Sequence, residues 1–580
     1  MNFLKNILSS CLGMMLAFTV IILFGFGLAV ALSGEEEIVV KPNTILEINL
    51  EEVVNDYTLQ PETPFDELFI EPKFQLTNIL NAIENAKYDD NIKGISINMA
   101  YVNAGLAQLK EIRDKIGEFK ETGKFVKAYA DFYSQSNYYL SSVADSVYIT
   151  PYGAVDFKGL ATERLYYKDF QEKYGVKMEV IRHGKYKSAV EGYMDNNMSE
   201  ANREQTTALL SSVWNTFLTD ISESRNIRID SLNNIADRLD SRTSEKSVEI
   251  GLVDGAIYYD QYLAKINPDS SSSEVNMIEL SQYIKAGKGK INVVSSDRIA
   301  VLYAQGTILY GEGDETYIGQ DNMNKALQKL RKDDNVKAVV LRINSPGGAA
   351  ITADLIWREL ELLKQKKPLV VSMGDVAASG GYWIAANANK IFAEPTTITG
   401  SIGVFGVIPN VSELSEDIGI NAEQVATNER SLTYSVFEPM TADFYSIQKE
   451  AIERVYKTFL ERVSDGRGMT VEEVNLVAQG RVWTGEEAKE IGLVDSIGGL
   501  QDAIEAAAGL AGVMEYRIVE YPRYQKDFKD TFAKLPIGVI KSYLIKSELG
   551  EENYKLFHEI VKLNKFRGVQ ALMPHEFKVK

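Results

Sequence analysis

The second half of the chain repeats the first at a spacing of 244 residues. The segment from Asp89 to Lys93 recurs as Asp333 to Lys337. Further identities keep this spacing without a gap, at Asp131, Tyr138, Pro151, Gly159 and Gly175 in the first half and at Asp375, Tyr382, Pro395, Gly403 and Gly419 in the second. The match ends at residues 249–254 and 490–495, where small insertions and deletions have changed the spacing to 241. A repeat of this length predicts two homologous domains.

Each repeat alternates short β-branched runs with longer amphipathic segments. Residues 336–343 are such a run, and a glycine-rich turn separates them from the amphipathic segment 351–364. The pattern returns at 368–373, followed by an apolar helix-like stretch at 382–388. This order is typical of parallel strands joined by helical crossovers, so the predicted fold class is α/β.

The predicted organisation has five parts, and the last of them belongs to neither repeat and receives no function. The parts are an N-terminal membrane anchor (1–40), a first repeat (41–266), a linker (267–296), a second repeat (297–512) and a C-terminal extension (513–580).

The N-terminal segment predicts where the chain resides. Residues 7–32 carry no charge over 26 positions, which as a helix is long enough to cross a bilayer core of roughly 30 Å. Ala29-Val30-Ala31 also offers a cleavage site, but an apolar region of this length is longer than that of an ordinary signal peptide. A retained anchor is therefore favoured over a cleaved one. Lys5 before the span and the acidic residues 35–37 after it predict that the bulk of the chain lies outside the cytoplasm.

Charge and residue counts exclude several function classes. With 62 Lys and Arg against 81 Asp and Glu, the net charge is −19, so nucleic acid is not an expected partner. The single cysteine, Cys11, excludes an intrachain disulfide, and three histidines leave no zinc cluster of the structural type. We expect no metal and no cofactor, so the chemistry must come from hydroxyls, amines or carboxylates.

The two repeats differ at chemically active residue types. Ser379 lies in a glycine-rich turn between a strand and a helix, and its counterpart in the first repeat is Gln135. Conversely, Lys187 belongs to the first repeat and faces Ser431 or a neighbour in 430–434, where the only basic residue is Arg430. Arginine cannot serve as a base because it stays protonated. One repeat is thus predicted to hold a nucleophile and the other its base.

A serine paired with a lysine indicates nucleophilic catalysis by an activated hydroxyl. The amine must be neutral, so burial has to lower the pKa of Lys187 from about 10.4. The backbone N–H groups of Gly380 and of Gly347 or Gly348 are the candidate donors for an oxyanion hole. Ser345, Ser401 and His183 are also reactive types, and we interpret the two serines as structural and the histidine as a wall residue.

These motifs, with the tandem layout around them, resemble the long, double-domain form of the signal peptide peptidase A (protease IV) family. The resemblance covers nearly the whole chain and rests on residues 186–191 in the first repeat and on 345–348 and 378–382 in the second. The chain departs from that pattern at Asn344, where relatives often have Asp, and at Gly192, where some have proline.

The resemblance implies crotonase/ClpP-like domains and a membrane-anchored serine endopeptidase that degrades released signal peptides. It assigns Ser379 as nucleophile and Lys187 as general base, and it implies a homotetramer in the bacterial inner membrane with its catalytic domains facing the periplasm. Two other readings stay open: a crotonase-like acyl-CoA enzyme and a noncatalytic membrane scaffold. Burial of Ser379 and Lys187 in one cleft, whether from one chain or from two neighbouring chains, would favour the peptidase.

Overall fold

The structure is a computed structural model that describes residues 13–18, 20, 38–59, 73–267, 274–431, 434–524 and 569–573. Across these ranges, none of the helices has both the length and the apolar character needed to cross a membrane. The predicted anchor at 7–32 lies mostly outside the described residues, so it stays a prediction.

The first repeat forms a sheet of six parallel strands in the order β8-β6-β5-β4-β1-β9. Apolar residues such as Ile95, Ile97 and Val126 are fully buried in it because helices pack against the strands, as in other parallel sheets. The strands are β1 (Thr44–Ile48), β4 (Ile92–Asn98), β5 (Phe125–Ala130), β6 (Ser146–Ile149), β8 (Gly255–Ala256) and β9 (Met277–Glu279), and two of the packing helices are α3 (Leu76–Tyr88) and α4 (Leu106–Lys120).

The second repeat forms the equivalent sheet in the order β19-β17-β15-β13-β10-β21, in which β16 also pairs with β15 and β20 pairs with β16. Strands β13 and β15 begin 244 residues after β4 and β5, so the predicted duplication of an α/β unit is confirmed. The strands are β10 (Arg298–Gln305), β13 (Val336–Ser345), β15 (Leu369–Ala378), β16 (Lys390–Ala393), β17 (Ile398–Gly400), β19 (Val482–Thr484), β20 (Ser496–Ile497) and β21 (Arg517–Tyr521).

Both sheets extend past the predicted ends of their repeats. Strand β9 lies within the predicted linker and pairs with β1, and strand β21 lies within the predicted C-terminal extension and pairs with β10. These edge strands are three and five residues long, too short for a clear alternating pattern in the sequence. The domain limits given above stay a prediction.

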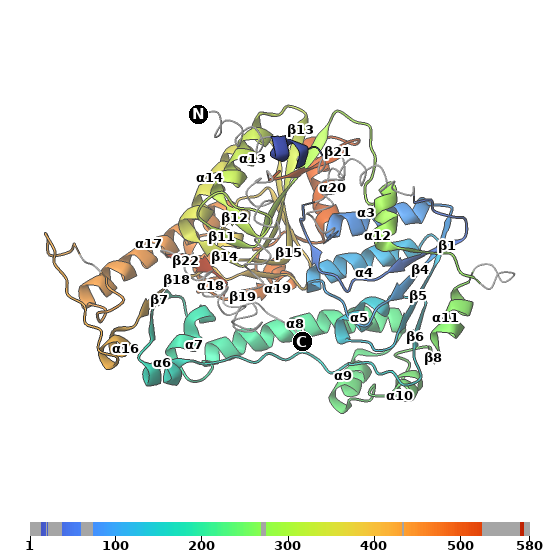
Figure 1. The fold of residues 1–580 in the computed structure, drawn as a ribbon, viewed down its shortest axis with the longest axis horizontal. Coiled ribbons are helices and arrows are strands. Elements are labelled where there is room, and N and C mark those ends of the chain that lie inside the picture. The colour runs from blue at the N-terminus through green and yellow to red at the C-terminus, as the bar shows by residue number, and fades with distance from the viewer. Residues whose placement is uncertain are drawn as a thin grey trace.

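A third sheet is shared by the two repeats, in the order β12-β11-β14-β22-β18-β7. Strand β7 comes from the first repeat and pairs antiparallel with β18 of the second along its whole length (Figure 1). The residues that follow β7 therefore lie against the second repeat. The strands are β7 (Lys177–His183), β11 (Thr307–Leu309), β12 (Tyr317–Gly319), β14 (Gly347–Ala349), β18 (Val404–Asn410) and β22 (Gln570–Leu572).

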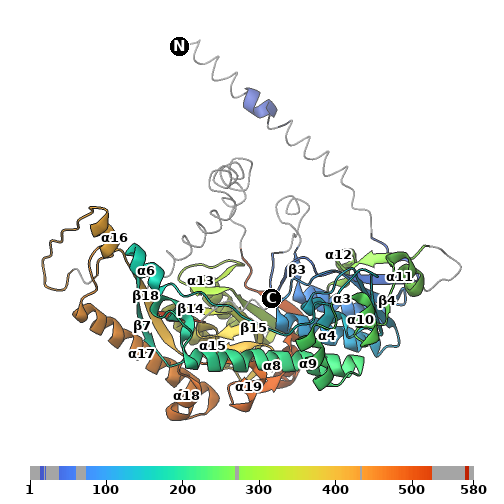
Figure 2. The same ribbon diagram turned by 90° about the horizontal axis from the view of Figure 1, so that it is seen from below.

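Helix α8 (Glu200–Arg225) connects the repeats along one side of the molecule (Figure 1, Figure 2). Its 26 residues give a length of about 39 Å. Phe217 packs into the core of the first repeat, whereas Leu209 packs with Val482 of the second. The hydroxyls of Ser212 and Thr484 lie 2.8 Å apart. The helix thus packs against both repeats at once.

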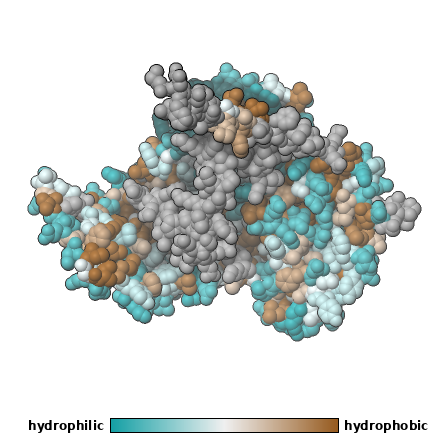
Figure 3. All heavy atoms as spheres, in the orientation of Figure 1, coloured by the Kyte–Doolittle hydropathy of each residue, from teal (hydrophilic) through white to brown (hydrophobic). Residues whose placement is uncertain are grey.

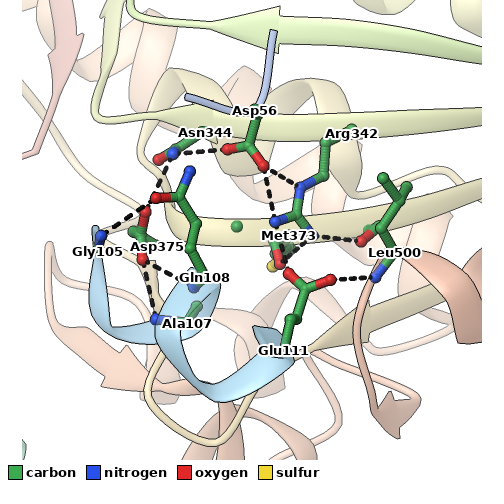
Figure 4. Close-up of polar contacts among 12 residues, drawn as sticks. Asp56, Gly105, Ala107, Gln108, Glu111, Arg342, Asn344, Met373, Asp375 and Leu500 are labelled. Atoms are coloured by element: carbon green, nitrogen blue, oxygen red, sulfur yellow. Dashed lines mark hydrogen bonds and ion pairs between the residues drawn. The ribbon is translucent and has the colours of Figure 1, made fainter. Parts of the chain in front are cut away.

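A buried ion cluster joins the repeats elsewhere in the interface (Figure 4). The Arg342 guanidinium, on β13, is fully buried and lies 2.8 Å from Asp56 Oδ1 and 2.6 Å from Glu111 Oε1. Glu111 belongs to helix α4 of the first repeat, and its other oxygen accepts a hydrogen bond from the Leu500 N–H at 2.8 Å. One cation of the second repeat is therefore held by two carboxylates that precede that repeat in the chain.

Asp375 extends this cluster to the strand that leads to Ser379. Its Oδ1 accepts hydrogen bonds from the Ala107 N–H at 2.9 Å and the Gln108 N–H at 3.3 Å, in the first turn of α4. The Asn344 amide donates to Asp375 at 3.2 Å. Burial raises the pKa of Asp375 to about 6. A side chain on β15 thus caps a helix of the other repeat.

We expect Arg342→Met to lower the free energy of unfolding by about 3–5 kcal/mol, because it leaves Asp56 and Glu111 buried without their cation. Urea unfolding of the detergent-solubilised protein, followed by tryptophan fluorescence, measures the shift in midpoint. Arg430→Met is the control, since the ion pair of Arg430 with Asp443 is exposed and is expected to contribute about 1 kcal/mol or less. Equal midpoints for the two variants would contradict a central role for Arg342.

Candidate active site

Ser379 occupies a sharp turn between strand β15 and helix α15 (Gly380–Ala385). Its φ of 55° and ψ of −115° lie outside the regions that non-glycine residues favour. Such strain is found where the surrounding structure holds a side chain for a purpose. The Ser379 N–H donates to the Gly400 carbonyl at 2.8 Å, and the side chain is fully buried.

The structure brings Lys187 to Ser379 of the same chain. Lys187 follows strand β7 by four residues, and pairing of β7 with β18 carries it into the second repeat. Its Nζ lies 2.9 Å from Ser379 Oγ. Both side chains have an exposed fraction of 0%, so the contact is closed to bulk solvent.

Two glycines make room for the lysine side chain. A methyl group added to Gly480 would lie 2.6 Å from Lys187 Cβ, and one added to Gly403 would lie 3.2 Å from its Cδ. Burial lowers the pKa of Lys187 well below its ordinary value. No ion pair joins Lys187 to a carboxylate within the described ranges, so none offsets the desolvation that disfavours the charged form of its amine.

Helix α8 holds the loop that carries Lys187. The Gln205 amide donates to the Tyr186 carbonyl at 3.0 Å and to Ser188 Oγ at 2.9 Å, on the two sides of the lysine. Because α8 also packs on both repeats, the position of this loop is tied to the way the repeats dock.

Ser401 is a site residue that the sequence interpretation missed. Lys187 Nζ lies 3.0 Å from both the carbonyl oxygen and the hydroxyl oxygen of Ser401. Ser401 is fully buried and has a φ of 51°, which is rare for serine. The available signal was a serine between Gly400 and Gly403, and we interpreted this serine as structural.

The glycine-rich segment 345–348 lies next to Ser379. A methyl group added to Gly347 would lie 2.6 Å from the Gly380 nitrogen, and one added to Gly380 would lie 3.2 Å from the Gly348 nitrogen. The Gly347 N–H donates to Ser345 Oγ at 3.2 Å. Ser345 therefore stabilises this turn, as interpreted. Gly347, one of the three predicted oxyanion donors, already donates its N–H to Ser345.

In the first repeat, Gln135 fills the position that corresponds to Ser379. Its Oε1 accepts hydrogen bonds from the Lys158 and Gly159 N–H groups at 3.1 and 3.0 Å, and its Nε2 donates to the Gly159 carbonyl at 3.1 Å. Gly159 is the counterpart of Gly403, which lines the lysine in the second repeat. In the first repeat, Gln135 thus fills the space that Ser379 and Lys187 occupy in the second repeat.

His183, which we interpreted as a wall residue, packs against an aromatic ring. His183 lies on β7, its ring stacks on Tyr456 at a centroid distance of 4.1 Å, and burial lowers its pKa. In the part of the chain that the structure describes, no cluster of three or more His, Cys, Asp or Glu residues is arranged to hold a metal ion.

Comparison with known proteins assigns both repeats to one family. A profile described as Peptidase family S49 matches residues 118–271 and 361–514, one span in each repeat. Protease 4 from Haemophilus influenzae is 37% identical over 517 residues, which cover 86% of this chain and 83% of that protein. The chloroplastic serine protease SPPA of Arabidopsis thaliana is 30% identical over 467 residues, which cover 78% of this chain and 69% of that protein.

Among solved structures, a ClpP1 mutant from Listeria monocytogenes matches 35% of this chain and 94% of its own, with 18% identity and a TM-score of 0.25. A superposition score this low supports no argument about the fold. The crotonase/ClpP-like assignment of each domain stays a prediction.

Proposed function

The chain belongs to peptidase family S49 and is a serine peptidase, and from this premise we propose that Ser379 is its nucleophile and Lys187 its general base. The observation that carries the proposal is the 2.9 Å contact between Lys187 Nζ and Ser379 Oγ, with both groups fully buried. An acyl-CoA enzyme has no use for this pair, and a scaffold has no need to keep it. The contact therefore supports the peptidase over both alternatives.

The neighbours of Lys187 suit a neutral amine, which has two N–H donors and one lone pair. We assign the two donors to the carbonyl and hydroxyl oxygens of Ser401, each 3.0 Å away. The lone pair is then directed at Ser379 and accepts its hydroxyl proton as Oγ attacks a peptide carbonyl. The resulting ammonium group passes the proton to the departing amine. A water molecule then attacks the acyl-enzyme while Lys187 takes its proton. The bond to Ser379 Oγ breaks as Lys187 returns that proton to the serine.

The negative charge that develops on the carbonyl oxygen requires preorganised donors. We propose the backbone N–H groups of Gly348 and Gly380 for this role, because both lie beside Ser379 while that of Gly347 is already used by Ser345. Small residues at these positions allow the substrate backbone to approach closely.

We propose that the substrates are released signal peptides and that residues 7–32 anchor the enzyme in the bacterial inner membrane, with the catalytic domains in the periplasm. Support comes from the motifs shared with signal peptide peptidase A and from the uncharged N-terminal segment. A peptidase fixed to the membrane meets apolar peptides where they are released. Deleting residues 1–40 is expected to move the protein from carbonate-washed membranes to the soluble fraction.

A homotetramer is our proposal for the assembled enzyme. It is supported by the family resemblance and by a group of exposed apolar residues near α16 (Ser412–Asp417), brown at the lower left of Figure 3. Helix α6 (Lys168–Tyr174) lies against this region, since the Leu414 N–H donates to the Gly175 carbonyl at 3.1 Å. The exposed side chains include Phe170, Tyr174, Ile418 and Ile420. Native mass measurement in detergent tests the chain count.

Ser379→Ala and Lys187→Ala are each expected to reduce kcat for an apolar fluorogenic peptide by about 10⁴-fold or more, since the pair acts as a unit. For the same reason, the double variant should be no slower than either single variant. Lys185→Ala is the matched control, because this exposed lysine is two residues away from the pair. Folding is checked by circular dichroism. Wild-type rates in Ser379→Ala would remove it as the nucleophile.

The pH dependence should report the titration of Lys187. Below its lowered pKa the amine is protonated and cannot accept the serine proton, and above it the amine is neutral; kcat/KM should therefore rise with pH through a value well below 10.5. Lys187→Arg should be inactive at every pH, because arginine stays protonated. A wild-type profile whose rise lies at or above pH 10.5 would contradict a buried lysine base.

A further inference from the structure

A cavity of about 430 Å³ lies in the interface between the repeats, next to the Arg342 ion cluster. Helices α3 and α4 of the first repeat line one side of it, and α20 (Leu500–Ala511) of the second repeat lines the other (Figure 1). Glu111, which binds Arg342, is one of the lining residues (Figure 4). Neither Ser379 nor Lys187 lines this interface cavity, so it is separate from the proposed active site.

The lining of the interface cavity is strongly acidic. Seven of its side chains are carboxylates, and only Lys87 and Lys115 are basic. Both lysines already form ion pairs with Glu84 and Glu118, at N–O distances between 2.8 and 3.4 Å. These four residues all belong to the first repeat. The two lysines are therefore engaged, and the cavity keeps an excess of negative charge.

The second repeat contributes carboxylates and no basic side chain to the lining. Asp502 and Glu505 lie on α20, and Glu394 follows strand β16. Asp502 accepts a hydrogen bond from the Gly499 N–H at 2.9 Å, and Glu505 accepts one from the Gln501 amide at 2.9 Å. None of the three acidic residues forms an ion pair with a basic side chain that the structure describes. This side of the cavity therefore lacks a cation.

Glu394 is a buried carboxyl without a polar partner among the described residues. Its exposed fraction is 4%, and its side chain makes no hydrogen bond or ion pair with any of them. It lies within electrostatic reach of Glu111 and Asp114 on α4, which line the opposite side of the cavity, so it faces the cavity. Burial raises the pKa of this carboxyl, and the two nearby acidic groups raise it further. A ligand that brings positive charge and N–H donors would relieve this cost.

The duplication indicates that the fold itself does not require these charges. The counterpart of Glu394 in the first repeat is Thr150, and a proline follows each of them. Helix α14 (Ala350–Lys364) is the counterpart of α4 at the spacing of 244 residues, and it has no carboxylate at three positions that are acidic in α4. These positions are Leu355, Arg358 and Leu362, which correspond to Glu111, Asp114 and Glu118.

The carboxylates are spread along the interface cavity. Glu111 and Glu118 are seven positions apart on α4, which is about 10 Å along the helix axis. Among the residues that the structure places, no three acidic or histidine side chains converge as ligands of one metal ion do. Leu80 and Ile291 add apolar surface to the lining. Ammonium groups joined by methylene chains suit this arrangement, because each ammonium can bind a carboxylate while the methylenes pack on apolar surface.

We propose that the interface cavity binds a linear aliphatic polyamine, with one ammonium group at Glu394 and another at Glu505. The bound polyamine joins helices α3 and α4 of the first repeat to α20 of the second. It therefore stabilises the docking of the two repeats. Binding uses neither Ser379 nor Lys187, so this inference does not rest on the proposed Ser-Lys mechanism.

Calorimetric titration with spermidine tests the cavity in full-length, detergent-solubilised Ser379→Ala protein, in which the proposed nucleophile is absent. We expect one spermidine to bind per chain. Adding Glu394→Gln should weaken binding about tenfold or more, because it removes the buried charge-assisted contact. Adding Glu505→Gln, at the exposed rim, should weaken it about two- to fivefold. Glu490→Gln is the matched control, since this exposed glutamate of the same repeat lies outside the cavity, and its affinity should be unchanged.

Thermal unfolding measures the effect on docking. Spermidine at about 100 times its Kd should raise the midpoint of the Ser379→Ala protein by about 2 °C, because it binds only the docked repeats. The same concentration should leave the midpoint of the protein with Glu394→Gln nearly unchanged.

Several results would overturn the polyamine site. One is the absence of binding heat, and another is equal weakening by Glu394→Gln and Glu490→Gln, which would indicate diffuse attraction to the net charge of −19. Displacement of spermidine by an equal concentration of Mg²⁺ would favour a metal ion instead. If circular dichroism shows that Glu394→Gln does not fold, unchanged affinity in Glu505→Gln would overturn the site. None of these results bears on the Ser-Lys pair, which is tested by hydrolysis of the fluorogenic peptide.

Discussion

The docking of the two repeats is the constraint on which the proposed active site depends, because Lys187 comes from the first repeat and Ser379 from the second. The buried guanidinium of Arg342 carries much of this docking, since it joins Asp56 and Glu111 across the interface. Asp375, on the strand that ends at Ser379, caps helix α4 of the first repeat. Removing one member of such a cluster leaves the others charged and desolvated. The intact cluster therefore favours one docked arrangement of the repeats over slightly shifted ones. The same strands that carry these residues lead directly into the turns at 345–348 and 379.

The docking also buries Lys187, and this desolvation lowers the pKa of its amine. A solvated lysine is protonated at neutral pH and has no lone pair to offer a serine. Strand β7 adds to the sheet of the second repeat and places Lys187 between Gly403 and Gly480, where its side chain is fully buried. In the proposed mechanism, the two oxygens of Ser401 accept both N–H groups of the amine, and its lone pair is directed at Ser379. In the first repeat, Gln135 stands at the position that corresponds to Ser379, and it binds the local backbone.

Much of this organisation was predictable because duplication leaves an internal comparison within one chain. The spacing of 244 residues predicted two α/β units, and the loss of Ser379 from one copy and of Lys187 from the other predicted a composite pair. The strands β9 and β21 were missed, because short edge strands give little periodic signal. Ser401 was missed for a different reason: its role depends on its position beside Lys187, and two residues 214 positions apart leave no mark of their contact in one sequence.

By itself, the sequence determined the repeat, the alternation of strands and helices, and the types of residue available for chemistry, since these follow from local pattern and composition. Only the tertiary structure decided that Lys187 meets Ser379 of its own chain, that its amine is buried, and that residues 569–573 lie along the glycine-rich strand. The physical reason is that strand addition between distant segments is mediated by backbone hydrogen bonds, which any sequence can form. Its register and partner are selected by close packing, and packing is a property of the assembled fold.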